Sequence, residues 1–349
     1  MNIVKQAIGI DISKDTFTAC GCTHTFNGET TFTPVHTFTN DKKGFNQLMR
    51  WSKSVVIKDA PMVFLMEATG VYYEKLAHHL HKINKQVIVV LPNMSKHYFS
   101  SLNIKSKTDE IDARVLSRFA VERVHRLWQP PKPIYIELRN LTRYLVQLNE
   151  QRTALSNIKH SKEAANEVQQ FVLRSNQTLV DQIDKQIERC KVEIEKFSQR
   201  DKDLIERVSN LMTIKGVGLI TIATIIAETL GFDGFKSAKQ LVSFAGYDVV
   251  QRESGTSIKG KTRISKKGNR YIRNALYFPA MVATRFNPVM KESYIRIIQQ
   301  KPSKMIGQVA IQRKLLTLMY TLWKNNVPFD PEYNKVASPI KAEATLDAQ

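Results

Sequence analysis

The sequence predicts an α/β domain followed by a mainly helical region, and three observations carry this prediction. Short apolar runs alternate with turn residues and helical patterns over residues 1–128. Prolines at positions 130, 131 and 133 then break the chain, because proline does not fit inside a helix. Beyond them, apolar residues recur every three or four positions, which is the spacing of helices that pack in pairs.

The first domain is expected to form a mixed sheet flanked by helices. Apolar and β-branched runs predict strands at residues 7–12, 16–22, 35–39, 61–66 and 86–91. Helical spacing predicts helices at residues 41–56, 73–83 and 108–121.

The rest of the chain is expected to be helical. A run of apolar residues at heptad-like intervals predicts a two-helix hairpin or coiled coil that reverses between Lys159 and Gln170. Its first half contains Leu138, Leu141, Leu145 and Leu148, and its second half contains Leu179, Ile183, Ile187, Cys190, Ile194 and Phe197. The predicted domains are therefore 1–128, a helical hairpin at 134–207, a third domain at 208–335 and a frayed tail at 336–349.

The charge of the chain indicates a polyanionic partner. The 349 residues include 52 Lys and Arg against 32 Asp and Glu, a net charge of +20, while 42% of residues are hydrophobic. A basic chain with enough apolar residues for a core is typical of nucleic-acid-binding proteins, and a small acidic metabolite does not require it. We expect a cytoplasmic protein associated with the nucleoid of a bacterium or archaeon, with no membrane span and no disulfide framework from its three cysteines.

Four acids stand where predicted strands end or a predicted helix begins. Asp11 and Glu67 follow the first and fourth strands, and Asp109 and Asp112 lie one turn apart on the helix at 108–121. Each acid alone is more often a turn residue or a helix cap. Together they are arranged as in a ribonuclease-H-like domain, in which the first and fourth strands are neighbours. Carboxylates that lie close together repel one another and need cations to stay ionised. Mg²⁺ fits such oxygen ligands best, and we expect two ions, for which Mn²⁺ can substitute.

A basic segment surrounds a serine in the C-terminal half. Residues 252–273 hold eight basic residues and one acid, Glu253, and so carry a net charge of +7. Glycines and hydroxyls in this segment favour close contact with phosphates, although a solvated basic face is the usual explanation of such a run. Ser254 is by itself more often a turn residue than a nucleophile. The basic residues are Arg252, Lys259, Lys261, Arg263, Lys266, Lys267, Arg270 and Arg273.

A glycine-containing turn precedes the basic segment. Residues 211–223 resemble a helix-hairpin-helix, in which Lys215, Gly216 and Gly218 would present backbone N–H groups to a phosphate at a helix N-terminus. A plain helical turn is the alternative.

Three N-terminal motifs resemble those of one family. These are the segments at 8–14 (IGIDISK), 66–72 (MEATGVY) and 107–113 (KTDEIDA). They resemble the motifs of the DEDD-type insertion-sequence transposases of family one-ten, understood as recombinases guided by a bridge RNA. Residues 252–255 (RESG), 257–260 (SIKG), 265–268 (SKKG) and 273–277 (RNALY) are similar to that family's C-terminal domain.

The resemblance implies a site-specific DNA recombinase that moves its own element. It assigns the D, E, D and D to Asp11, Glu67, Asp109 and Asp112 in a RuvC-like domain, and the nucleophilic serine to Ser254. It further implies target and donor DNA, a structured guide RNA, and a tetramer of two dimers as partners.

Two alternatives stay open at this point. A junction resolvase would use the carboxylates with water as its nucleophile and would not need Ser254. A non-enzymatic DNA- or RNA-binding protein would need neither the serine nor Asp11.

Overall fold

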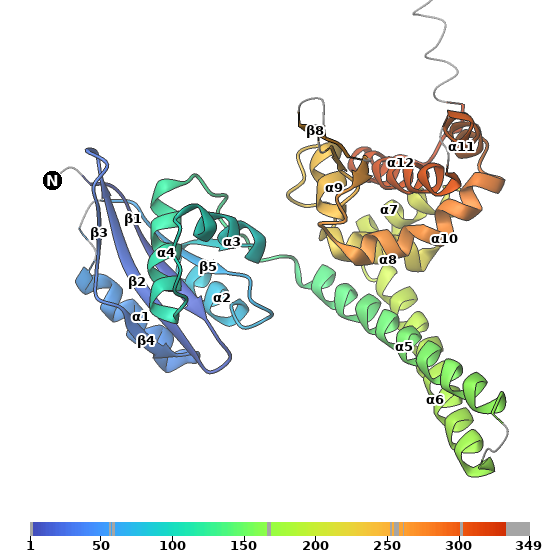
Figure 1. Cartoon of the computed structure of the whole chain (residues 1–349), viewed down its shortest axis with the longest axis horizontal. Coiled ribbons are helices and arrows are strands. Elements are labelled where there is room, and N and C mark those ends of the chain that lie inside the picture. The colour runs from blue at the N-terminus through green and yellow to red at the C-terminus, as the bar shows by residue number, and fades with distance from the viewer. Residues whose placement is uncertain are drawn as a thin grey trace, which may run out of the picture. The chain divides into compact units, whose positions relative to one another are not determined.

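The chain forms two compact units, residues 1–130 and 131–349, each with its own hydrophobic core (Figure 1). The computed structural model describes residues 3–55, 57, 60–165, 169–251, 253–254, 258–260, 262–300 and 303–332.

A mixed sheet organises the N-terminal unit. Its strand order is β3-β2-β1-β5-β6, and β4 also pairs with β2. The strand β2 pairs with β1, β3 and β4 in antiparallel fashion. The pairs β1–β5 and β5–β6 are parallel. The strands are β1 (Ile3–Ile12), β2 (Thr16–Thr25), β3 (Thr30–Phe32), β4 (His36–Thr39), β5 (Met62–Glu67) and β6 (Gln86–Val90).

Helices cover both faces of this sheet, because alternate side chains of each strand point to opposite sides. Ile8, Ile10 and Met66 pack with residues of α1 and α2 on one face. Ala7 and Leu65 pack with residues of α3 and α4 on the other. The helices are α1 (Lys42–Val55), α2 (Glu74–Lys82), α3 (Pro92–Ser101) and α4 (Asp109–Glu122).

Two elements of this unit differ from the sequence prediction. The strand β3 was not predicted. It is separated from β4 at Thr33, whose side-chain hydroxyl, rather than a backbone carbonyl, accepts a hydrogen bond from the Gly21 amide of β2 at 2.9 Å. The helix α3 was not predicted either. Pro92 ends the preceding strand, as expected, but it also starts α3, because its missing N–H costs nothing in a first helical turn.

A long helical hairpin begins the C-terminal unit (Figure 1). Its helices α5 (Pro133–Glu163) and α6 (Gln170–Ser198) pack side by side. The reversal is shorter than the predicted span, because α5 continues to Glu163; residues 166–168 lie outside the described residues. The predicted seam supplies much of the buried contact, through Leu138, Leu145, Leu148, Ile187, Cys190, Ile194 and Phe197.

Among the described residues, six further helices form the body of this unit, and one of them, α12, packs against α7, α9, α10 and α11. Leu315, Leu316 and Met319 of α12 are fully buried. The six are α7 (Lys202–Met212), α8 (Leu219–Thr229), α9 (Ala238–Ala245), α10 (Arg270–Phe286), α11 (Pro288–Gln300) and α12 (Lys304–Asn325). The described residues between α9 and α10 include four two-residue strands, namely β7 (Val249–Val250), β8 (Glu253–Ser254), β9 (Ile258–Lys259) and β10 (Arg263–Ile264).

The predicted class, a mixed sheet domain followed by helices, is confirmed at this level of detail. No described helix is both long enough and apolar enough to cross a bilayer. Cys20, Cys22 and Cys190 are free thiols. The predicted domain limits at 128, 207 and 335 stay predictions, and the tail at 336–349 lies outside the described residues.

Candidate active site and nucleic-acid interface

Two of the four predicted acids lie at the ends of neighbouring parallel strands. Asp11 is the next-to-last residue of β1, and Glu67 is the last residue of β5. The register pairs Ile10 with Met66, so the two acids stand level with each other one residue further on. Leu65 is buried on the α4 side of the sheet. By alternation, Glu67 points to that same side.

A glycine in β1 allows α4 to lie directly on the strand. A Cβ atom at Gly9 would lie 2.1 Å from the amide nitrogen of Ser117 and 2.4 Å from the carbonyl oxygen of Ala113. A side chain here would therefore push the helix away. Because α4 begins four residues before Ala113, this close approach carries its first turn toward Asp11.

The first turn of α4 supplies the other two predicted acids. The helix begins after Thr108, which caps it because its hydroxyl accepts a hydrogen bond from the Ile111 amide at 3.3 Å. Asp109 is exposed, whereas the Asp112 side chain keeps only 13% of its surface accessible. The structure thus brings acids from two strands and one helix to one edge of the sheet.

The acids repel one another. Burial, which is the largest cause, and the nearby charges of Asp112, Asp109 and Glu67 together raise the pKa of Asp11 to about 6, against a smaller opposing effect of Lys107. Burial also raises the pKa of Asp112, where Lys107 opposes the shift and Asp109 and Glu67 add to it. Four carboxylates in this position therefore need a positive partner to stay ionised together.

Hydrogen bonds hold Glu67 but leave part of Asp112 unpaired. The hydroxyls of Thr69 and Ser95 donate to the two carboxylate oxygens of Glu67. Lys107 lies 3.8 Å from Oδ2 of Asp112 and is itself largely exposed. The other oxygen of Asp112, Oδ1, is buried and has no hydrogen-bond partner in the described part of the chain.

The donor set fits a hard divalent cation. A cation such as Mg²⁺, which binds oxygen ligands, would provide a partner for the buried carboxylate oxygen that has none. Its positive charge would also stabilise the ionised form of the carboxyls whose pKa values are raised. Within the described residues, however, no three or more acidic, His or Cys side chains are gathered closely enough to hold a metal. The acids thus interact electrostatically without forming a ready-made cage, and the magnesium assignment stays a prediction.

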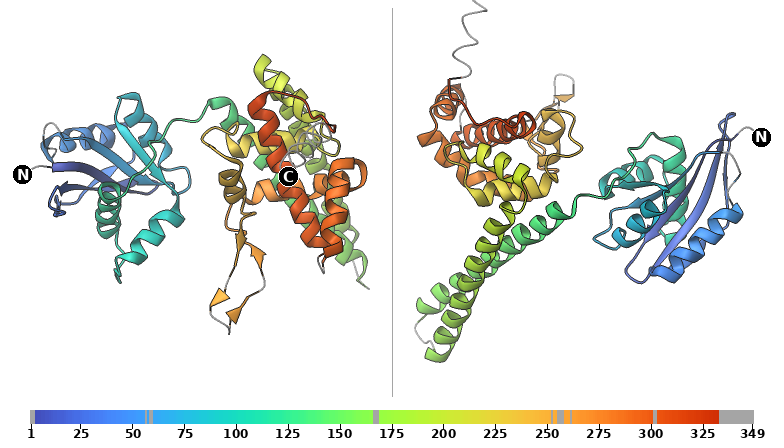
Figure 2. Two further views of the ribbon diagram at one scale, coloured as in Figure 1. Left: turned by 90° about the horizontal axis from the view of Figure 1, so that it is seen from above. Right: turned by 180° about the vertical axis from the view of Figure 1, so that it is seen from behind.

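Ser254 lies on a short antiparallel ribbon of the C-terminal unit. The backbone of Glu253 and Ser254 in β8 pairs with that of Ile258 and Lys259 in β9. The ribbon stands out from the helices of this unit (Figure 2, left). The side chains of Ser254 and Lys259, and all of Arg252 and Lys261, fall outside the described residues.

The remaining predicted basic residues lead from this ribbon into α10. Arg263 lies in β10, Lys266 and Lys267 lie in the following loop, and Arg270 and Arg273 lie in the first turns of α10. The first four are exposed. Arg273 instead donates to the Ala245 carbonyl at 2.7 Å and so helps to hold the loop in place.

A buried carboxylate anchors the start of α10. Glu228 of α8 has 1% of its side chain exposed and accepts two hydrogen bonds from Arg143 of α5, at 2.7 and 2.8 Å. It also accepts one from the side chain of Asn269 at 2.6 Å. The carbonyl oxygen of the same Asn269 amide caps α10 by accepting from the amides of Tyr271 and Ile272. The basic loop is thereby tied to the hairpin.

The predicted glycine turn connects α7 and α8. Lys215 and Gly218 are exposed, and Gly218 precedes the first turn of α8, where an added Cβ would have no described atom within 4 Å. Gly216 has a positive φ of 99° and packs against the backbone of Ala283 in α10. This packing explains Gly216 without a ligand, and phosphate binding by the turn stays a prediction.

Comparison with known proteins gives the family. Residues 8–162 match a DEDD transposase family model of the IS110 type, and residues 208–295 match the model of the Transposase IS116/IS110/IS902 family. The chain is 32% identical over 334 residues to a "Pilin gene-inverting protein" of Moraxella lacunata, and the match covers 93% of this chain and 98% of that protein. The chain belongs to the IS116/IS110/IS902 family of transposases.

Further matches vary in extent. A protein of the same name from Moraxella bovis matches over the same length at 32% identity. An insertion-element protein of Streptomyces coelicolor is 22% identical to the transposase over 120 residues, which cover 34% of this chain and 29% of that protein. A solved structure of a Ppx/GppA family member from Aquifex aeolicus covers 97% of this chain and 98% of its own at 10% identity, but its TM-score of 0.22 supports no inference.

Several residues that support the two candidate sites of the transposase are not predicted from the sequence. Gly9 and Glu228 act through packing and burial, which become visible only when distant segments meet. Arg313 and Lys314 of α12 approach Arg263 and Arg273 of the basic segment from about fifty residues further along the chain. Their adjacent positive charges in a largely apolar helix are the one signal that marks them.

Proposed function

We propose that this transposase is a site-specific recombinase in which metal-bound carboxylates and Ser254 cleave and rejoin DNA strands. The observation that supports this most directly is the convergence of Asp11, Glu67, Asp109 and Asp112 at one edge of the sheet, with a raised pKa at Asp11 and an unpaired oxygen on Asp112.

In this proposal the four carboxylates would hold Mg²⁺. The bound ions would polarise the scissile phosphodiester and stabilise the negative charge that develops on it. Glu67 would be oriented by the hydroxyls of Thr69 and Ser95. Asp112 would use Oδ1, the oxygen that no described residue pairs.

Ser254 would act as the nucleophile. Its Oγ forms a bond to phosphorus while the bond to one DNA oxygen breaks; the serine proton passes to a base, and the departing DNA oxygen takes up a proton. The phosphoserine ester keeps the energy of the broken bond, so a second DNA hydroxyl can reverse the step and join new ends. Position on a projecting ribbon suits a residue that must reach the backbone of a duplex.

The basic residues would hold the nucleic acids. Arg263, Lys266, Lys267 and Arg270 are exposed beside the ribbon and can pair with phosphates. The total charge of +20 exceeds what this one segment carries, which supports a second polyanion. We propose a structured guide RNA as that second partner and a tetramer of two dimers as the working assembly, both from the family resemblance.

The arrangement of the recombining sites would decide the product. Strand exchange between two sites in direct orientation excises the intervening DNA, whereas exchange between inverted sites inverts it. The similarity to proteins named for pilin gene inversion supports an inversion reaction alongside excision and insertion.

A plasmid assay tests this function. A plasmid carrying the gene with its native flanking DNA is introduced into cells, and junctions formed by excision, insertion or inversion are sequenced. Asp11→Asn and Ser254→Ala should each abolish the junctions while DNA binding is retained. Asp15→Asn removes an exposed acid four residues from Asp11 and serves as the matched control.

The result for Ser254 separates the main alternatives. A hydrolytic resolvase, with water as its nucleophile, predicts full activity of Ser254→Ala, and that outcome would remove the serine mechanism. A non-enzymatic binding protein predicts that Asp11→Asn behaves like Asp15→Asn.

A further inference from the structure

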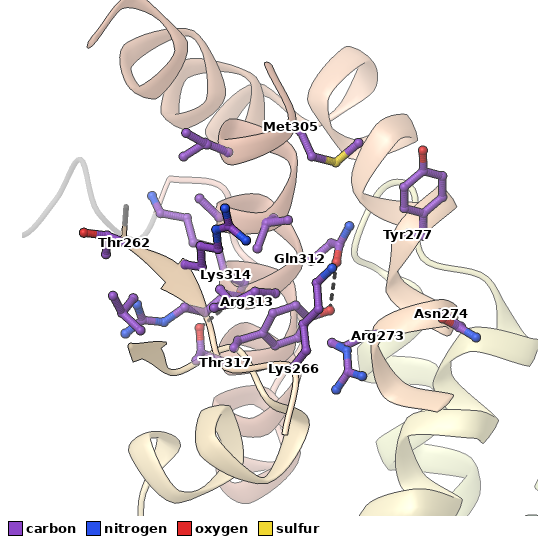
Figure 3. A pocket seen from close by; sticks show the side chains of 17 residues that line it. Thr262, Lys266, Arg273, Asn274, Tyr277, Met305, Gln312, Arg313, Lys314 and Thr317 are labelled. Carbon is purple, nitrogen blue, oxygen red and sulfur yellow. Dashed lines mark hydrogen bonds between the residues drawn. The ribbon is translucent and has the colours of Figure 1, made fainter. Parts of the chain in front are cut away.

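A cavity opens in the C-terminal unit at the base of the ribbon that carries Ser254. It has a volume of about 1250 Å³ and is bounded by α12, α10 and the β7–β10 pair (Figure 3). Its position follows from the fold, because Val249 of β7 and Ile264 of β10 pair with each other and both line it. Ser254 lies four residues beyond the end of β7.

The wall of the cavity is strongly basic. Five of its 17 described side chains are cationic, and none is acidic. None of the ion pairs found among the described residues uses one of the five. They are Arg263, Lys266, Arg273, Arg313 and Lys314. Positive charges that share a cavity without a carboxylate favour an anionic ligand.

Lys314 lies in a partly buried and positively charged environment. Burial lowers the pKa of its ammonium group and the charge of Arg296 lowers it further, against the opposing charge of Glu292; neither Arg296 nor Glu292 lines the cavity. Its Nζ donates to the hydroxyl of Ser293 at 2.6 Å. A phosphate in the cavity would offset the repulsion that Lys314 experiences.

The opposite part of the wall is apolar and still exposed. Tyr277 of α10 has 38% of its surface accessible, and Met305 and Ile306 of α12 have 52% and 44%. The ring of Phe278 packs edge-on against that of Tyr277, with 5.3 Å between the ring centroids. An exposed aromatic ring beside cations that form no ion pair with a described residue is the combination that holds single-stranded nucleic acid, because bases stack on the ring while phosphates meet the charges.

The floor of the cavity is already fixed without a ligand. The hydroxyl of the buried Tyr247 donates a hydrogen bond to Oε1 of Gln312 at 2.9 Å (Figure 3). This bond joins α12 to the start of the connection between α9 and α10, which contains Ser254. Arg273 is held by the Ala245 carbonyl. A preformed cavity of this kind loses little conformational freedom when it binds.

We propose that this cavity binds one unstacked nucleotide of a single strand, with its phosphate on Arg313, Lys314 and Arg263 and its base against Tyr277, Met305 and Ile306. The proposal rests on the proposed recombinase function, since it describes how a strand would be held beside the ribbon. Arg313 and Lys314 lie outside the region 208–295 that matches the family model, so that comparison does not assign this site.

The test compares strand types with the full-length protein. Fluorescent single-stranded DNA, single-stranded RNA and duplex DNA of one sequence are titrated against wild type and variants. Tyr277→Ala should weaken binding of a single strand at least about fivefold, the lower limit for loss of one stacked base, and change duplex binding less than about twofold. Tyr277→Phe keeps the ring and should bind as wild type.

Charge is tested separately. Arg313→Gln should lower the salt dependence of single-strand binding by about 0.7 in the slope of log K against log salt, the value for one lost phosphate contact. Lys239→Gln removes an exposed cation of the same unit outside the cavity and is the matched control. A larger effect of Tyr277→Ala on DNA than on RNA assigns the cavity to a DNA strand, and the reverse assigns it to RNA.

Equal weakening of single strands and duplex by Tyr277→Ala, or no weakening of either, would overturn the proposal. Equal salt slopes for Arg313→Gln and Lys239→Gln would also overturn it. Failure of the recombinase mechanism is visible separately, because Ser254→Ala should bind all three probes as wild type while losing strand exchange. An active Ser254→Ala protein with a strand-selective Tyr277→Ala defect would refute the nucleophile and leave the cavity proposal standing.

Discussion

Replacing Asp11 by Asn should make the metal-free protein more stable at neutral pH. The carboxyl of Asp11 is partly buried beside three other acids, and its pKa is raised to about 6 in the folded chain, from an ordinary value of 3.8. Asparagine has nearly the same shape but no charge. The substitution therefore removes electrostatic repulsion while it keeps the packing.

The magnitude follows from the pKa shift. A rise of about two units corresponds to at most about 3 kcal/mol, and we reduce this to about 1–2 kcal/mol because the side chain keeps contact with solvent. The raised pKa means that the folded state binds the proton more tightly than the unfolded state. The charge of Asp11 therefore does not lower the free energy of unfolding below about pH 4. It lowers that free energy progressively as the pH rises to about 6, and by a constant amount above it.

Thermal unfolding of the full-length protein measures this effect. Without divalent ions at pH 7.5, Asp11→Asn should raise the melting temperature by about 3–8 °C, and the difference should shrink toward pH 5. Added Mg²⁺ should raise the melting temperature of wild type and have much less effect on the variant. A variant that is less stable than wild type at pH 7.5, or that responds equally to Mg²⁺, would refute the acid-cluster account.

Two further substitutions test how the sites are supported. Gly9→Ala should lower the free energy of unfolding by about 2–4 kcal/mol, because the new methyl group meets the backbone of α4, and it should also weaken the Mg²⁺ response. Gly218→Ala, in an open position, should cost less than about 1 kcal/mol, and similar losses for the two would argue against the close approach of α4. Glu228→Gln should cost about 1–2 kcal/mol in urea unfolding followed by circular dichroism, less than for a fully buried pair because the Arg143 side chain is 40% exposed and water can solvate its charge; a loss below about 0.5 kcal/mol would show that this pair does not anchor α10.

Much of the fold could be predicted because the signals are local. Alternating apolar residues around Ile8 and Ile10 mark β1, and the heptad-like spacing from Leu179 marks α6. The helix α3 was missed because its residues show only weak amphipathic spacing and Pro92 is usually interpreted as a stop signal. The strand β3 was missed because its three residues carry too short a pattern.

The sequence predicts the acidic residues of the candidate site but not the residues that hold its helices and strands in place. Asp11 and Glu67 lie at the ends of strands whose apolar pattern is clear, so their proximity needs only the correct strand order. The close packing at Gly9 and the buried partners of Glu228 depend on contacts between segments far apart in the chain. No spacing rule in the sequence predicts that Arg313 meets Arg263 at one cavity.

Ser254 as the nucleophile is tested most directly by locating the covalent bond between protein and DNA. The purified protein is incubated with Mg²⁺, its co-purifying RNA and DNA from the flanks of its gene, then denatured, and the DNA-linked peptide is identified by mass spectrometry. A phosphoester on Ser254 should form in wild type and not in Asp11→Asn. DNA cleaved to free ends without any attached peptide, or an attachment at another residue, would contradict it.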